Sequence, residues 1–474
     1  MFQKAQRQRL ACFAIALVVI LLARASFAAE ELTAHQELLH DIYKELIEID
    51  TTTATGDTKA AVEAMAARLK AAGFPDDDVH AFSPAPRKGN LVARLRGSGA
   101  RKPILLVAHI DVVPANPADW SVEPFRLTEK DGYFYARGSA DQKYMAASHI
   151  ANLIRYKQEG FKPERDIIVA LETDEEIFDA DGVGMHWLIR NHRDLIDAEF
   201  ALNEGGGVSL RDGKAIKNSV QTSEKIPVSY QLTVRNPGGH SAAPRKDNAI
   251  YRLAEGLVRL SKFEFPVNLN DTTRLYFARS AQFENEQTAA DLRTTASDQP
   301  DPAAVARLSA NPSYNAILRT TCVATMLEAG QAINALPQLA SAKVNCRVMP
   351  NESIEEVKAT LTRVLADDQI VVTQIGPADP SPPSELNETI LGAVEKVSHQ
   401  LWPDAVILPV MIAGATDGAF LRSAGIPTYG NSGMALEASD GARIHGRDER
   451  VPIKSFYQGN EYLYRLVKAL SGGG

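Results

Sequence analysis

Short apolar runs of strand length alternate with helix-length segments over most of this chain. The run 104–108 (ILLVA) is followed by a helical pattern at 140–156, and the run 166–171 (DIIVAL) by another at 182–191. These runs are apolar almost throughout, as in strands that are buried on both faces. The alternation predicts an α/β fold, a mixed and mostly parallel sheet that is covered by helices on both faces. In such a sheet, functional sites gather beyond the carboxyl ends of the strands.

The alternation of apolar strands and helices stops near residue 220. Residues 228–235 (VSYQLTVR) alternate apolar and polar side chains, which is typical of a strand with one exposed face. A helix at 247–262 and a polar stretch at 284–312, which we expect on the surface, come next. Two further strands follow at 317–326 and 342–348. The strand–helix alternation returns at 370–372. We therefore predict a small α+β domain at 219–348, inserted between two parts of one α/β domain, 29–218 and 349–474.

Residues 1–28 have the layout of a secretory signal peptide. A basic head precedes the apolar run Leu10–Ala23, and small residues then permit cleavage after Ala28. The alternative is an uncleaved membrane anchor, but the 14 residues of this run span only about 21 Å as a helix, against ~30 Å for a bilayer core. We therefore expect an exported protein, periplasmic or secreted, with no stable membrane anchor after cleavage.

The mature chain is acidic. Removal of residues 1–28 takes away four positive and no negative charges, so the formal net charge falls from −8 to −12. An acidic body without a basic stripe argues against nucleic acid and anionic membranes as partners. Cys322 and Cys346 remain in the mature chain. They could pair with each other, but we expect them to be unpaired small residues of strands.

Ionisable side chains stand at strand ends or beside glycines at five places. They are, in order, His109, Asp141, Glu176, Glu204 and His445. Each has a simple structural alternative when it is taken alone; Asp141, for example, could cap the helix that follows it. Carboxylates and imidazoles at buried strand ends are costly unless something binds them. A pair of divalent metal ions would use this set of ligands.

Two further acids accompany these candidates. Asp111 points to the same side of the chain as His109, where a carboxylate could orient the imidazole of a metal ligand. Glu175 precedes Glu176 in the run TDEE, so the two side chains point in different directions. One of them could bind metal while the other holds a water molecule. A solvated acidic loop is the alternative, although the apolar strand before the run favours burial.

In this order, the motifs closely resemble those of the co-catalytic dizinc family of acetylornithine deacetylase, succinyl-diaminopimelate desuccinylase, glutamate carboxypeptidase and aminoacylase. The resemblance extends over about residues 36–470. It rests on AHIDVVP (108–114), ARGSADQK (136–143), TDEE (173–176), NEGG (203–206), GGHSAAP (238–244), INALP (333–337), NCRVMP (345–350), GATDGAF (414–420) and RIHGRDERV (443–451). It implies that the α/β domain is catalytic and that the inserted domain is a ferredoxin-like lid and dimerisation domain.

The resemblance also implies roles for the acids and histidines. Five residues would be metal ligands. Asp141 would bridge both ions. His109 and Glu204 would complete one site, and Glu176 and His445 would complete the other. Glu175 would be the general base, and Asp111 would orient His109.

In the inserted domain, the resemblance implies three substrate-binding residues. His240 would reach the scissile carbonyl, usually from the other subunit of a homodimer. Asn334 and Arg347 would hold the carbonyl and the carboxylate of the substrate. From spacing alone, His240 would be an ordinary turn residue and Arg347 a surface arginine. Two positions depart from the family pattern: Cys346 stands where aspartate is frequent, and Gln142 is an uncommon residue after the bridging aspartate.

The implied activity is hydrolysis of an amide or peptide bond next to a free carboxylate, by a carboxypeptidase or dipeptidase. Two zinc ions per chain would serve it, with Co²⁺ or Mn²⁺ as substitutes. An N-acyl amino acid deacylase of the aminoacylase type is the alternative. Export suits the scavenging of small peptides or N-acyl amino acids better than a biosynthetic step. A catalytically dead binding protein is a remote alternative, because the predicted ligands and the base are all present.

Overall fold

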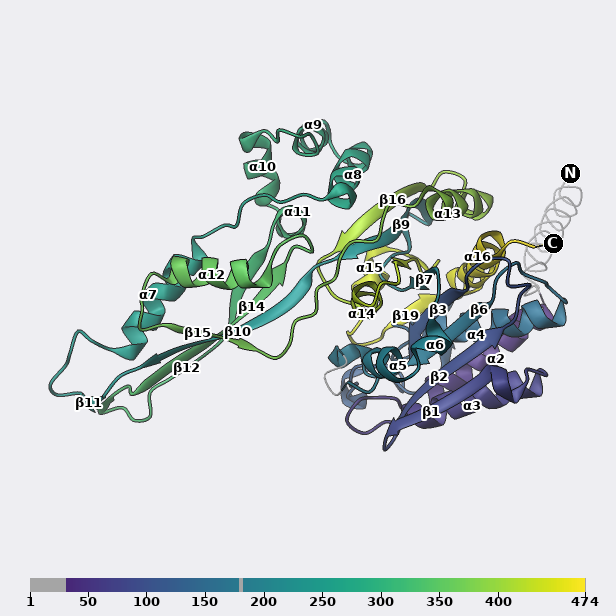
Figure 1. Ribbon diagram of the computed structural model, residues 1–474, viewed down its shortest axis with the longest axis horizontal. Coiled ribbons are helices and arrows are strands. Elements are labelled where there is room, and N and C mark those ends of the chain that lie inside the picture. The colour runs from purple at the N-terminus through teal and green to yellow at the C-terminus, as the bar shows by residue number, and fades with distance from the viewer. Residues whose placement is uncertain (1–30, 179–181, 474) are drawn as a thin grey trace, which may run out of the picture.

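The computed structural model describes residues 31–178 and 182–473 (Figure 1). The predicted signal peptide, residues 1–28, lies outside the described residues. None of the described helices is both long and apolar enough to cross a membrane.

The larger unit is built on a ten-stranded sheet in the order β1-β2-β6-β3-β7-β17-β9-β8-β18, with β16 paired to β9. Its strands are β1 (Val79–Ala85), β2 (Lys88–Leu95), β3 (Ile104–His109), β6 (Ile167–Glu172), β7 (Phe200–Asn203), β8 (Val208–Arg211), β9 (Lys214–Glu224), β16 (Val406–Ile412), β17 (Thr428–Gly430) and β18 (Ala435–Leu436). Strand β3 lies parallel to β6 and β7, whereas β1 and β2 form an antiparallel pair, as do β8 and β9. The predicted α/β fold with a mixed sheet is confirmed.

The central strands face a hydrophobic core on each side of this sheet. Leu106 of β3 and Val169 of β6 belong to the larger core. That core includes the helices α2 (Ala34–Glu48), α3 (Thr58–Ala71), α4 (Lys143–Gln158), α13 (Glu388–Leu401) and α16 (Ile453–Ser471). Leu105 and Ile168 point the other way, into a second core with α5 (Met185–Asn191), α6 (Arg193–Ile196) and α14 (Gly418–Ser423). Burial on both faces explains why these strands contain no alternating polar residues.

The smaller unit is an antiparallel sheet of four strands in the order β12-β14-β10-β15. Its strands are β10 (Ile226–Arg235), β12 (Thr321–Ala329), β14 (Leu339–Val348) and β15 (Val371–Ile375). The helices α7 (Ala249–Ser261) and α12 (Ile354–Leu365) supply Leu253 and Leu361 to a core with Val228 of β10. Alternate residues of β10 are only partly buried, which explains the alternation seen in the sequence.

The smaller unit continues past residue 348, where the sequence predicts the end of the inserted domain. The sequence predicts that residues 370–372 form a strand of the large α/β domain. Strand β15 overlaps these residues, but it pairs with β10 of the smaller sheet. Helix α12 packs against α7, so it also belongs to the smaller unit. This unit therefore extends to Ile375. A short apolar run suits either sheet by its periodicity, and only its pairing partner decides between them.

Four helices before β12 form a separate cluster with an apolar centre made of Phe277, Leu292 and Leu308. They are α8 (Asp271–Ser280), α9 (Glu286–Thr295), α10 (Pro302–Ser309) and α11 (Pro312–Leu318). The polar stretch 284–312 lies within this cluster. Figure 1 shows the cluster beside β16, and α8 contacts that strand directly.

Cys322 and Cys346 form a disulfide bond, which corrects the expectation that they remain unpaired. The two residues stand opposite each other in the antiparallel strands β12 and β14. Their Cα atoms are 4.1 Å apart, although 24 positions separate them in the sequence. Strand register brings the sulfur atoms together, and cysteine spacing alone does not contain that register.

Candidate active site

Three neighbouring strands of the large sheet end at one edge. Strands β6, β3 and β7 are adjacent and parallel, so their carboxyl ends meet. His109 is the last residue of β3, and Glu204 follows β7. Glu175 and Glu176 follow β6 after a short turn. The sheet topology thus gathers acids and an imidazole from distant parts of the sequence at the edge where α/β proteins hold their ligands.

A small three-stranded sheet brings two more residues to this edge. Strand β19 (Arg450–Pro452) pairs with β5 (Tyr133–Tyr135), which also pairs with β4 (Thr128–Lys130). Asp141 lies in the loop after β5, and His445 lies in the loop before β19. His445 has a φ of 61°, in the left-handed region that residues other than glycine rarely adopt. Backbone strain of this kind clusters at functional sites.

Asp141 lies between the two imidazoles. Its Oδ1 is 3.1 Å from Nε2 of His109, and its Oδ2 is 3.0 Å from Nε2 of His445. Oε2 of Glu176 is also 3.0 Å from Nε2 of His445, and Oε2 of Glu204 is 3.8 Å from Nε2 of His109. The ligand atoms form two groups, each within 4.8 Å: His109, Asp141 and Glu176, and His109, Glu175 and Glu204. Each oxygen of Asp141 therefore faces a different half of the site.

Asp111 organises the backbone beneath this cluster. Its carboxylate accepts hydrogen bonds from the backbone N–H groups of Glu175 and Glu176, both at 3.2 Å. Nδ1 of His109 is 3.0 Å from the carbonyl oxygen of Asp111 and 3.6 Å from its carboxylate. Asp111 thus contacts the His109 ring mainly through its carbonyl group and holds the acidic turn through its side chain, which is a wider role than the sequence indicated.

Burial and crowding change the acid–base properties of the site. Burial, together with the charge of Glu204, raises the pKa of Glu175 well above the usual glutamate value. Burial likewise raises the pKa of Glu204 to about 7. Hydrogen bonds to Asp141 and Glu176 raise the pKa of His445 to about 10. Carboxylates forced together in this way form a site that stabilises a cation.

The donor set fits divalent metal ions. Two imidazoles and a group of carboxylates are the ligands that zinc and related first-row ions share. Within the described part of the chain, Oε1 of Glu176 is buried without a hydrogen-bond partner, as expected for an oxygen that binds an ion. Asp141 directs one oxygen toward each imidazole, so it can serve two ions at once.

Two residues that the sequence did not single out, Arg137 and Glu449, join the loops of Asp141 and His445. The buried carboxylate of Glu449 accepts hydrogen bonds from the backbone N–H of Asp141 at 3.1 Å and from Nη1 of Arg137 at 2.6 Å. Nη2 of Arg137 donates to the carbonyl oxygens of His445 at 3.2 Å and of Gly446 at 3.0 Å. Both residues lie inside recognised motifs, but their partnership depends on the pairing of β5 with β19.

The three residues predicted to bind substrate lie apart from the metal ligands. His240 of β11 (Gly239–His240) and Asn334, which precedes β13 (Ala335–Leu336), are neighbours, because the N–H of Ser241 donates to the carbonyl of Asn334 at 3.0 Å. Both are exposed, and Figure 1 shows β11 at the opposite end of the molecule from β3, β6 and β7. Arg347 lies on β14, and burial lowers the pKa of its guanidinium.

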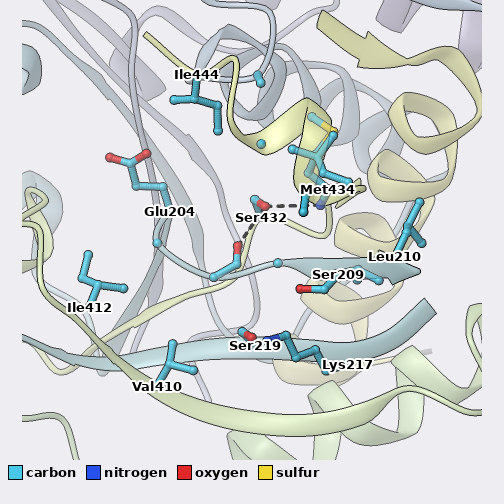
Figure 2. Close-up of a pocket in the computed structure, with 18 of the residues that line it drawn as sticks. Glu204, Ser209, Leu210, Lys217, Ser219, Val410, Ile412, Ser432, Met434 and Ile444 are labelled. Carbon is cyan, nitrogen blue, oxygen red and sulfur yellow. Dashed lines mark hydrogen bonds between the residues drawn. The ribbon is translucent and has the colours of Figure 1, made fainter. Parts of the chain in front are cut away.

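A cleft of about 840 Å³ opens beside the metal ligands (Figure 2). Asp141, Gln142 and Glu204 are among the residues that line it. Most of the other lining residues come from the β8–β9 hairpin, from β16, from the helices α8 and α11, and from residues 432–444. Nε2 of Gln142 donates to Oε2 of Glu204 at 2.8 Å, so the uncommon residue after Asp141 orients a predicted metal ligand.

Carboxylates and imidazoles gathered at the strand ends of an α/β sheet have the composition of a divalent-metal site. Residues 105–469 match the model of peptidase family M20/M25/M40, and the chain belongs to this family. Probable carboxypeptidase S-like 2 of Dictyostelium discoideum is 31% identical over 376 residues, which cover 77% of this chain and 71% of that protein. N-fatty-acyl-amino acid synthase/hydrolase PM20D1 of Xenopus tropicalis is 31% identical over 395 residues, which cover 77% and 72%.

Solved structures share the fold. The M20 family metallo-carboxypeptidase Sso-CP2 from Sulfolobus solfataricus has a TM-score of 0.69 at 18% identity, over 92% of this chain and 99% of that chain. Human carnosine dipeptidase 1 has a TM-score of 0.60 at 14% identity, over 92% and 97%. The resemblance that the motifs indicated is confirmed, and the chain is an enzyme of the class that hydrolyses amide bonds.

Proposed function

We propose that this protein is an exported hydrolase with two zinc ions, which cleaves an amide or peptide bond next to a free carboxylate. The observation that carries the proposal is the position of Asp141, whose two oxygens face the imidazoles of His109 and His445 at 3.1 and 3.0 Å. A bridging carboxylate of this kind serves a pair of metal ions. Bound zinc would polarise the carbonyl of the substrate and lower the pKa of the attacking water.

In this proposal, Glu175 moves the proton. Its carboxylate lies within 4.8 Å of the ligand atoms of His109 and Glu204, and its backbone N–H is held by Asp111. It would accept a proton from the attacking water and pass it to the leaving nitrogen. A raised pKa suits both halves of this transfer, because the carboxyl group must hold the proton between the two steps.

Arg347 would bind the free carboxylate of the substrate. Its neighbours on β14, Cys346 and Val348, are fully buried in the core of the smaller unit, so the guanidinium lies on the other face of that sheet. A planar guanidinium pairs with a carboxylate by two parallel hydrogen bonds. Peptides and N-acyl amino acids both carry a carboxylate near the scissile bond. The clamp serves both classes of substrate; a carboxypeptidase or dipeptidase is the first candidate, after the carboxypeptidases that this chain resembles, and an N-acyl amino acid hydrolase is the second.

The surface of the smaller unit supports a homodimer. Strand β12 is an edge strand, and Val323 and Leu327 on it are 61% and 64% exposed. A long apolar edge is uncommon on a monomer, because it offers unpaired backbone groups to a second chain. Pairing with another copy along β12 would cover it. A dimer would also give a role to His240, which lies far from the metal ligands of its own chain and would act in the other subunit (Figure 1).

Two features support export. The apolar run Leu10–Ala23 and the small residues before Ala28 have the layout of a cleaved signal. The disulfide between Cys322 and Cys346 would persist in an oxidising compartment. N-terminal sequencing of the protein recovered from outside the cytoplasm should begin directly after Ala28. A mature protein that starts at Met1 would refute cleavage.

Metal analysis tests the core of the proposal. Mature protein saturated in zinc-containing buffer and then freed of excess metal should hold about two equivalents per chain, as a two-ion site requires. Its hydrolytic activity should disappear with a chelator and return with zinc. Full activity at a reproducible one equivalent would refute the two-metal site.

A further inference from the structure

We propose that Lys225 is the second cation of the carboxylate-binding site, so that the substrate carboxylate is attracted by the charges of both Arg347 and Lys225. This inference rests on the proposed function, in which Arg347 binds the free carboxylate. Lys225 lies where β9 of the larger unit ends and β10 of the smaller unit begins, between Glu224 and Ile226. Figure 1 shows these two strands on either side of the junction between the units.

The strand register places Lys225 beside Arg347. In the smaller sheet, Arg347 of β14 lies between Pro227 of β10 and Thr321 of β12. Lys225 precedes Pro227 by two residues, and its Nζ is 3.4 Å from Oγ1 of Thr321. Register partners in adjacent strands direct their side chains to the same face of a sheet. The ammonium group therefore reaches the face of the sheet on which the guanidinium lies, next to the cross-strand neighbour of Arg347.

Neither cation has an acidic partner within the described residues. Nζ of Lys225 donates to the carbonyl oxygen of Arg319 at 2.6 Å, and its other close partner is the neutral hydroxyl group of Thr321. Burial lowers the pKa of the Arg347 guanidinium, and no neighbouring acid counters this effect. Buried charges in proteins are normally paired. Two adjacent cations without an acid therefore form a site that attracts an anion.

The other charged groups around this site are already engaged. Glu352 accepts hydrogen bonds from two neutral side chains, the hydroxyl group of Thr320 and Nδ2 of Asn268. Two further acids form ion pairs with arginines: Glu224 with Arg422, and Glu264 with Arg319. A substrate carboxylate would therefore supply the negative charge that Lys225 and Arg347 lack.

Burial makes the charge of Lys225 depend on pH near neutrality. The side chain of Lys225 is fully buried, and this burial lowers the pKa of its ammonium group to about 7. The charge of Glu352 opposes the effect, and that of Arg347 adds to it. A nearby carboxylate favours the charged form of the lysine and raises this pKa. By linkage, the carboxylate must bind more tightly when Lys225 is protonated.

Lys225 can act on the carboxylate without touching it. In a partly buried site, a charge several ångströms away changes the affinity for an ion by about tenfold. The effect depends on the charge of the ligand, so an amide in place of the carboxylate should not feel it. Lys225 is thus expected to determine the preference for free acids, and not the rate of the chemical step.

Binding of a free acid tests the proposal without turnover. Metal-loaded Glu175→Gln protein would be titrated with N-acetyl-phenylalanine in a calorimeter, about one pH unit below the pKa of Lys225. Adding Lys225→Met should weaken this binding at least ~10-fold, because one of the two charges is lost. Binding of N-acetyl-phenylalanine amide should stay the same. Unchanged affinity for the free acid in the folded variant would overturn the proposal.

Proton uptake is a second readout, and it needs no substitution of Lys225. About one pH unit above its pKa, the lysine of the free protein is mostly neutral, so binding of the free acid should take up protons. A tenfold preference for the protonated form corresponds to an uptake of about 0.4 proton per site. Heats measured in buffers of different protonation enthalpy give this number. Equal uptake with the free acid and with the amide would overturn the proposal.

Lys225→Arg separates the charge from the shape of the side chain. Because arginine keeps its charge at high pH, this variant should retain its affinity above the pKa of the lysine and take up no proton. Lys343→Met is the matched control, since Lys343 is an exposed cation on the same side of β14 as Arg347. It should change neither affinity nor proton uptake. A folded Lys225→Arg protein as weak as Lys225→Met would overturn a role of the charge.

Arg347→Ala distinguishes failure of this inference from failure of the proposed function. If Arg347→Ala weakens binding of the free acid and Lys225→Met does not, only the role of Lys225 is overturned. If neither substitution weakens it, the carboxylate clamp fails, and with it the proposed preference for a bond next to a free carboxylate.

Discussion

Glu175 and Glu176 are adjacent in the chain but belong to different groups of ligand atoms. Glu176 lies 3.0 Å from Nε2 of His445, whereas Glu175 is grouped with His109 and Glu204. Glu175→Gln should lower kcat by roughly 10²–10⁴-fold and leave both metal ions bound, because an amide cannot accept the proton. Glu176→Gln should instead lose metal from one site. Metal analysis and kinetics of both variants would show whether these two roles are reversed.

Substitution of Arg347 tests whether a free carboxylate is required. Arg347→Ala removes a charge-assisted bidentate contact, so kcat/KM on a free-acid substrate should fall at least ~10-fold. Lys343→Ala is the matched control, because Lys343 is a cation on the same side of β14 and is exposed. The matching C-terminal amide should be a poor substrate for the wild type and change little in the variant. Equal wild-type rates on acid and amide would refute the carboxylate clamp.

At the scale of elements, the pair of Arg137 and Glu449 joins two loops that each carry a predicted metal ligand. The carboxylate of Glu449 accepts hydrogen bonds from the backbone N–H groups of Ala140 and Asp141. Glu449→Gln replaces one of its oxygens by an NH₂ group, which cannot accept such a bond. Residues behind the ligands typically contribute 10–100-fold to metal affinity. We therefore expect the stoichiometry in limiting zinc to fall toward one, with recovery in excess zinc.

The neighbouring acid supplies the control for this prediction. Asp448 accepts hydrogen bonds from Ser121, at 2.8 Å from its N–H and 3.0 Å from its hydroxyl group, and it makes no such bond to the Asp141 loop. Asp448→Asn should therefore retain two zinc ions under the same conditions. An identical loss of zinc in both variants would show that the whole loop is disturbed, and not that Glu449 positions Asp141.

At the scale of the whole molecule, the distance between the β11 tip and the metal ligands predicts a site shared between subunits (Figure 1). His240→Ala and Glu175→Gln proteins should each be nearly inactive. Mixing them should restore about a quarter of the wild-type rate, because half of the dimers are mixed and each of these has one complete site. Kinetics after subunit exchange, verified with differently tagged chains, would measure this. Proven exchange without recovered activity would show that His240 does not act across a dimer.

Much of the larger unit follows from local sequence. Leu105 and Leu106 enter opposite cores, and a strand that needs both faces buried must be apolar along its length. The position of His109 and Glu204 after such strands placed them at the functional edge, because parallel strands end together. The sequence therefore predicted the mixed sheet and the set of residues that meet at its edge.

The tertiary structure decided what depends on contacts between distant segments. Strand β15 joined the smaller sheet and Cys322 met Cys346 because of antiparallel register, which local periodicity does not encode. The cleft needs a hairpin, β16 and two inserted helices to converge, and residues from 140 to 444 line it. The periodicity of a segment predicts which of its faces must be buried. The segment that packs against this face lies elsewhere in the chain, and local periodicity does not identify it. For this reason the candidate metal ligands were visible in the motifs, whereas the cleft beside them was visible only in the fold.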